Sequence, residues 1–124
     1  MVKNITIISI LFLLQSCNYR EHYTSQEITI QSCRYNAQGG VTIKFLPVME
    51  SVYFGSGVNL KLSEDSSIAY LIFVRQHREG RKIKTDVPSK FFRNDTMIYS
   101  WVDLPYHFEK VIVTPPDSVY YVNE

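Results

Sequence analysis

Short apolar runs separated by turn-forming residues fill most of this chain, and this pattern limits its possible folds more than any other feature. Within the runs, apolar and polar residues alternate with the two-residue period of a half-buried β-strand, most clearly at Val58, Leu60 and Leu62. No segment repeats its apolar residues at helical spacing over three turns. The pattern predicts eight or nine short strands, including residues 28–35, 41–45, 58–62, 68–74, 83–87, 97–102, 110–114 and 119–122.

Many short strands with regularly spaced turns are typical of a β-sandwich or a small barrel, and we favour the sandwich. The strand count and the region around Trp101 resemble those of immunoglobulin and fibronectin type III domains. The resemblance implies an all-β sandwich fold and nothing about activity, because many functions share such folds.

Two aromatic or apolar segments carry further expectations about packing. Residues 68–74 are apolar on both faces, as in a central strand that is covered on both sides. Phe91 and Phe92 lie in a polar segment, and we expect one of the two rings to reach the core. In residues 97–102, the alternation places Tyr99 and Trp101 on one face of the predicted strand.

The first 17 residues follow a different pattern. Lys3 precedes a mostly apolar run at residues 5–14, and Gln15 and Ser16 follow before Cys17. This order is that of a secretory signal peptide. The apolar run has only about half of the roughly 20 residues that a transmembrane helix needs.

Residues 14–17, Leu-Gln-Ser-Cys, resemble the lipobox of bacterial lipoproteins, and the resemblance covers residues 1–17 only. It implies that a diacylglycerol is attached to the Cys17 thiol, that the chain is cleaved before Cys17, and that the new amino group is acylated, as with palmitate. Asn18 stands where lipoproteins retained in the inner membrane often carry aspartate, so the outer membrane is favoured. Two or three acyl chains hold a protein at a bilayer where one does not.

The expected organisation is therefore a signal peptide at residues 1–16, a lipidated cysteine and tether at 17–26, and one β-sandwich domain at 27–124. The tether is polar and without periodicity. Cys33 is then the one remaining cysteine, and its strand-like surroundings indicate a small buried residue; a reactive thiol is the alternative.

Charge and motif content exclude several classes of function. The chain has 13 Lys and Arg against 12 Asp and Glu, which lacks the cationic excess that nucleic-acid binding requires. His22, His77 and His107 have no second ligand at the spacing of a metal site, and no nucleophile motif occurs. We therefore predict no cofactor, no metal and no enzyme activity. A hydrolase would require a pair among His77, His107, Asp103 and Cys33 to converge.

One segment has a strongly uneven charge. Five cations and one carboxylate surround Gly80 between two predicted strands, and the cations are Arg75, Arg78, Arg81, Lys82 and Lys84. They could bind an anionic partner such as lipid headgroups, an acidic glycan or an acidic protein face. Alternatively, they guard a sheet edge against pairing with another chain.

Two further features bear on surface chemistry. The nine tyrosines are suited to a binding surface, although they are equally suited to strand packing. Thr96 and Ser118 follow aspartates in a pattern that resembles the O-glycosylation acceptor of some bacterial envelope proteins.

Together these observations predict a non-catalytic, lipid-anchored protein of the cell envelope whose domain binds a protein or glycan partner, with the membrane as its anchoring surface. The alternative is an envelope inhibitor or immunity protein that neutralises a toxin or a protease, which requires only a rigid surface with a few anchoring side chains.

Overall fold

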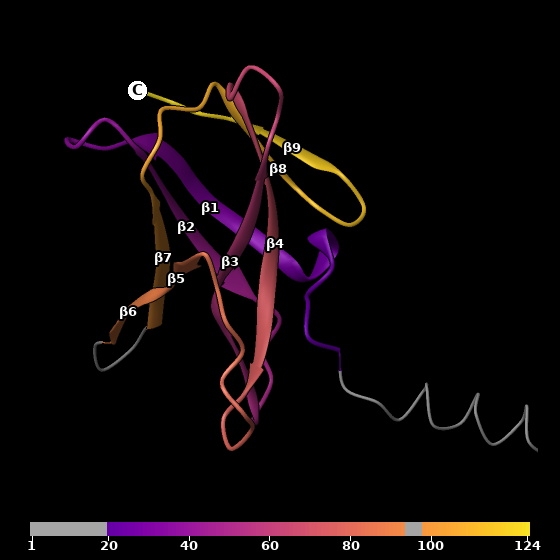
Figure 1. The fold of residues 1–124 in the computed structure, drawn as a ribbon. Helices are drawn as coiled ribbons and strands as arrows, with labels where there is room; N and C mark the ends of the chain where they lie inside the picture. Colours follow the sequence, from indigo (N-terminus) through magenta and orange to yellow (C-terminus); the bar gives the residue numbers. More distant parts are fainter. Residues whose placement is uncertain (1–19, 94–97) are drawn as a thin grey trace, which may run out of the picture.

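The computed structural model describes residues 20–93 and 98–124, which form two β-sheets packed face to face (Figure 1). The four-stranded sheet has the order β1-β2-β7-β6, with β1 (Ile28–Tyr35), β2 (Val41–Pro47), β6 (Lys90–Arg93) and β7 (Ile98–Leu104). The five-stranded sheet has the order β5-β3-β4-β8-β9, with β3 (Tyr53–Leu62), β4 (Ile68–His77), β5 (Val87–Pro88), β8 (Lys110–Val113) and β9 (Ser118–Tyr121). A short 3-10 turn, η1 (Ser25–Glu27), precedes β1. The predicted all-β sandwich is confirmed.

The two sheets differ in how closely they follow an immunoglobulin domain. The four-stranded sheet is antiparallel throughout, and its order corresponds to the A-B-E-D sheet of a constant-type domain. In the five-stranded sheet, β4 and β8 run parallel. The β3–β4 hairpin places β4 beside β8. The resulting β4–β8 pair is parallel, whereas the sheets of immunoglobulin domains are antiparallel.

The core lies between the sheets and follows the two-residue alternation of the strands. On β2, Val41, Ile43 and Phe45 are fully buried, and the residues between them face outward. On β4, the Phe73 ring packs against the Phe45 ring with 4.7 Å between their centroids. Because only one sheet covers β4, Ile72 on its outer face is half-buried. The expectation that residues 68–74 would be covered on both faces is therefore wrong at Ile72, whereas Val74, which also lies on the outer face by alternation, is fully buried.

Residues 20–26, which we expected to belong to a solvated tether, are part of the domain. The Tyr23 N–H donates to the Phe73 carbonyl (3.0 Å), and the Arg75 N–H donates to the Glu21 carbonyl (2.7 Å). The Tyr23 side chain is 1% exposed, and Ser25 is tied to the carbonyl of Pro115 (2.8 Å). The first two of these bonds lie along the part of β4 that extends beyond its pairing with β8, so backbone groups of this polar segment are paired within the domain.

Three strand predictions also differ from the structure. β3 begins at Tyr53, well before the expected start, and residues 83–87 contribute only Val87 to a two-residue strand. Phe91 and Phe92 form part of the edge strand β6, where they are 50% and 55% exposed, so neither ring is in the core.

Within residues 20–93 and 98–124, no helix has the length and apolarity needed to cross a bilayer.

Candidate functional site

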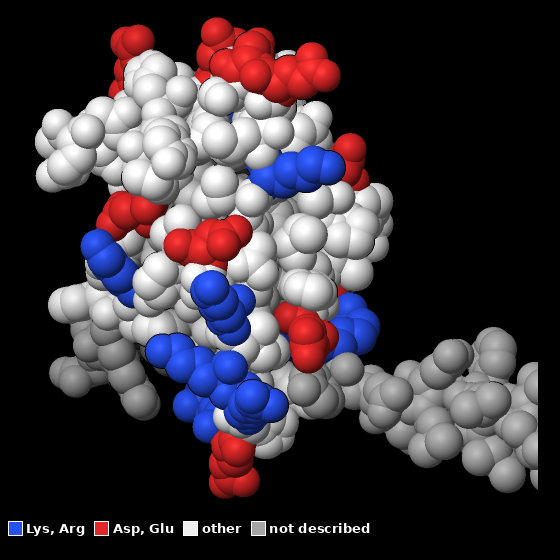
Figure 2. All heavy atoms as spheres, viewed as in Figure 1, with Lys and Arg blue, Asp and Glu red and all other residues white. Residues whose placement is uncertain are grey.

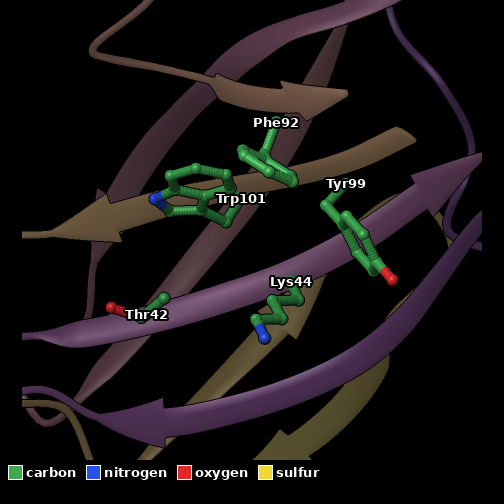
Figure 3. A pocket seen from close by; sticks show the side chains of 5 residues that line it. All are labelled: Thr42, Lys44, Phe92, Tyr99 and Trp101. Carbon is green, nitrogen blue, oxygen red and sulfur yellow. The ribbon is translucent and has the colours of Figure 1, made fainter. Parts of the chain in front are cut away.

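A groove of about 460 Å³ crosses the outer face of the four-stranded sheet. Its lining residues come from β2, β6 and β7: Thr42, Lys44, Phe92, Tyr99 and Trp101 (Figure 3). The sheet register builds it directly, because Trp101 lies opposite Lys44 on β2 and Phe92 lies opposite Tyr99. The groove therefore presents three aromatic rings and one ammonium group on a rigid sheet.

A polar hollow of about 290 Å³ adjoins this groove. It is lined by Asn36, Gln38, Gly40, Lys90, Asp103, Leu104 and Pro105. The Thr42 hydroxyl, in the groove, donates to the Asp103 carboxylate of the hollow (2.6 Å), and Lys90 forms an ion pair with the same carboxylate (3.0 Å). The two hollows thus share one hydrogen-bonded wall.

Asp103 is ionised at this wall. Burial favours its neutral form, but the hydrogen bonds from Thr42 and Lys90 outweigh burial and lower the pKa of Asp103. Asn36 extends the same network, since its side-chain amide donates to the Thr42 hydroxyl (3.1 Å). A ligand in the groove would therefore meet fixed hydrogen-bonding groups at one end.

The basic segment around Gly80 divides into one internal cation and four exposed ones. Arg75 is not a free binding residue: its guanidinium donates two hydrogen bonds to Glu50 (3.0 and 2.5 Å) and lies 3.6 Å from the centre of the Tyr53 ring. The expectation that Arg75 belongs to an exposed patch is therefore wrong, because a carboxylate 25 residues away neutralises it. The cations that remain exposed are Arg78, Arg81, Lys82 and Lys84.

A buried glutamine shapes the loop that carries these four cations. The Gln76 side chain donates to the carbonyls of His77 and Arg81 (both 3.0 Å) and accepts a hydrogen bond from the Ile83 N–H (2.8 Å). Gln76 is buried at the end of β4. It replaces the strand pairing that we expected after Gly80 and holds the loop in a defined shape.

The groups that a hydrolase would need each contact a different neighbour. His77 meets the edge of the Tyr53 ring, His107 stacks on Tyr35 with 4.1 Å between centroids, and Asp103 faces Thr42 and Lys90. In the described ranges, no group of three or more His, Cys, Asp and Glu residues could hold a metal ion.

Cys33 is a buried free cysteine on β1, as the sequence indicated. Burial raises the pKa of its thiol to about 11, so the reactive thiolate is scarce at neutral pH.

The predicted modification sites are placed only in part. Ser118 begins β9 opposite Val113 and is half-buried. Thr96 and Cys17 lie outside the described residues.

Sequence reasoning did not find the groove as a site. The alternation at Tyr99 and Trp101 correctly placed both rings on one face, but the strand that contributes Phe92 was missed.

Comparison with known proteins adds nothing to this picture: no family model, curated protein or solved structure matches the chain.

Proposed function

We propose that this chain is a non-catalytic, lipid-anchored protein of the cell envelope, and that its β-sandwich binds an envelope glycan in the groove on the four-stranded sheet. The anchoring part rests on the lipobox-like residues 14–17. The binding part rests on one observation, which is the gathering of Phe92, Tyr99 and Trp101 in a single groove with Lys44.

The chemistry of the groove favours a saccharide as the ligand. Flat aromatic faces stack on the C–H faces of sugar rings, and a few fixed polar groups then select among sugars by hydrogen bonding. Here the rings lie in the groove, and the Thr42–Asp103–Lys90 network lies at one end of it. Lys44 adds a positive charge that suits an acidic sugar.

The anchoring part is tested by labelling. We expect radioactive palmitate to enter the wild-type chain and not the Cys17→Ala variant, and the variant to leave the membrane fraction. A variant that is still processed and remains membrane-bound would contradict lipid anchoring.

The binding part is tested with the processed full chain, purified in detergent and probed with arrayed fragments of envelope glycans. We expect Trp101→Ala to weaken binding of a captured glycan by about ten-fold or more, as for a central aromatic anchor. Tyr121→Ala is the matched control, since Tyr121 is an exposed tyrosine on β9 of the other sheet. Equal loss in both variants, or no bound glycan at all, would overturn the proposal.

A further inference from the structure

Two loops that are distant in sequence meet at one end of the sandwich. The β2–β3 loop, residues 48–52, and the β4–β5 loop, residues 78–86, are joined by a hydrogen bond from the Arg78 N–H to the Val52 carbonyl (2.8 Å). We call this surface the basic end.

The basic end combines apolar and cationic side chains, all of them exposed. The β2–β3 loop presents Val48, Met49 and Val52, and Met49 is 95% exposed. The β4–β5 loop presents the cations Arg78, Arg81, Lys82 and Lys84. Exposed apolar side chains beside a cationic cluster are the composition that peripheral membrane proteins place at the headgroup boundary.

The carboxylates nearby offset part of this positive charge and leave the cations in excess. Glu50 is held by Arg75, and Glu27 is held by Arg20. The Asp86 carboxylate accepts a hydrogen bond from the Leu60 N–H on β3. Glu79 and Asp86 are exposed carboxylates of the β4–β5 loop, and Glu21 is exposed beside the end of β4, so four cations face three nearby negative charges.

The charge is also polarised along the β3–β4 hairpin. On the face shown in Figure 2, a cluster of Lys and Arg side chains lies at the lower end with one acidic side chain at its tip, and the largest group of Asp and Glu side chains lies at the opposite end, with further acidic side chains between them. Glu64 and Asp65 lie in the exposed turn that joins β3 to β4, at the far end of the hairpin from the cations. Such a molecule orients in the field of a negative surface with its basic end toward it.

The described chain also begins beside the basic end. The Arg20 carbonyl accepts a hydrogen bond from Arg75 (3.2 Å), two residues before β4 ends at His77. Glu27 bonds through its carbonyl to the Val48 N–H (2.8 Å), at the start of the β2–β3 loop. From Arg20 back to Cys17 there are three residues, which span about 10 Å when extended.

We infer that the basic end rests on the anionic phospholipid headgroups of the bilayer that holds the anchor. This inference rests on the proposed lipid anchor, because a tether of about 10 Å keeps the basic end within reach of the headgroups. The four cations bind the anionic surface, while Met49 and its apolar neighbours enter the headgroup region. The groove on the four-stranded sheet then has a fixed orientation relative to the membrane.

The test measures the depth of two positions in the processed, lipidated full chain. A fluorophore is attached at Met49→Cys in one sample and at Leu62→Cys in the other. Met49 precedes β3 and Leu62 ends it, so the two labels lie about 30 Å apart along the strand. Each chain is placed in vesicles of phosphatidylcholine, with or without phosphatidylglycerol, that contain a lipid-borne quencher.

We expect strong quenching at position 49 in anionic vesicles and weak quenching at position 62. Replacing the four cations by glutamine should weaken contact by about five-fold for each cation removed. Raising the salt concentration from about 0.1 to about 1 M should also weaken the quenching at position 49, since the screening length falls from about 10 to about 3 Å. The salt titration uses the unaltered loop and so does not depend on the folding of the glutamine variant.

Flotation separates the inference from the anchor on which it rests. A lipidated chain floats with both kinds of vesicle, and failure to float overturns the lipid anchor and the inference together. A chain that floats but shows equal quenching at positions 49 and 62, or quenching insensitive to salt and to the loop charges, overturns the inference alone.

Discussion

Two ion pairs hold Arg20 to η1 and the β2–β3 loop to β4. The Arg20 side chain donates two hydrogen bonds to Glu27 (2.6 and 2.8 Å), and Glu27 also accepts one from the Thr24 N–H (2.9 Å). Arg75 makes the matching bidentate pair with Glu50 on the same side of the sandwich. These residues therefore stabilise the fold, and the charge available to a partner lies in the loop beyond His77.

Glu27 makes the stability of the domain depend on acid. The hydrogen bonds from Arg20, with that from Thr24, lower the pKa of Glu27 from about 4.5 to about 2. Because the folded-state pKa is the lower one, its contribution is fully present above pH 4.5 and is lost as the pH falls toward 2. We expect Glu27→Gln to cost about 1 kcal/mol at pH 7 and nothing near pH 2. Urea unfolding across this range measures the difference.

The control for Glu27 is Glu64→Gln, which alters an exposed carboxylate in the turn between β3 and β4. We expect it to change the free energy of unfolding by less than about 0.5 kcal/mol at either pH. A Glu27→Gln penalty that stays constant from pH 7 to pH 2 would contradict the role assigned to the ionised carboxylate.

At the scale of elements, the loop after β4 depends on one side chain. Gln76 makes three hydrogen bonds to the backbone of residues 77–83. Its removal leaves two carbonyls and one N–H without these partners, and each unsatisfied buried group is costly. We expect Gln76→Ala to cost about 2 kcal/mol and to speed hydrogen exchange at the Ile83 amide. Gln38→Ala, in the exposed turn after β1, is the control and should leave that amide unchanged.

Features that lie within one strand could be predicted from the sequence, whereas features formed by contacts between elements could not. The alternation on β2 predicted its buried and exposed faces correctly, because a single strand carries that signal. The groove needed the pairing of Phe92 with Tyr99, and the role of Arg75 needed Glu50. Both depend on which strands and loops become neighbours, and no local pattern encodes that.

At the scale of the whole molecule, the position of the domain boundary decides how freely the sandwich can move. The expected tether of nine residues, 18–26 after the lipidated Cys17, would have allowed the domain to stand off the membrane. With residues 20–26 held against β4 and the Pro115 carbonyl, only about 10 Å of chain separates Arg20 from Cys17. Lipidation at Cys17 would thus restrict both the distance and the orientation of the domain.

Tyr23 provides a direct measure of that boundary. Its side chain is buried in the core cluster, and burial together with the nearby Glu50 carboxylate raises the pKa of Tyr23 to about 12. We expect Tyr23→Ala to cost about 3 kcal/mol in unfolding free energy, as for other buried aromatic side chains. Tyr121→Ala, at a site that is mostly exposed, should cost less than about 1 kcal/mol. Urea unfolding measures both free energies. Equal small losses in the two variants would contradict the assignment of residues 20–26 to the folded domain, and the tether would then be longer than about 10 Å.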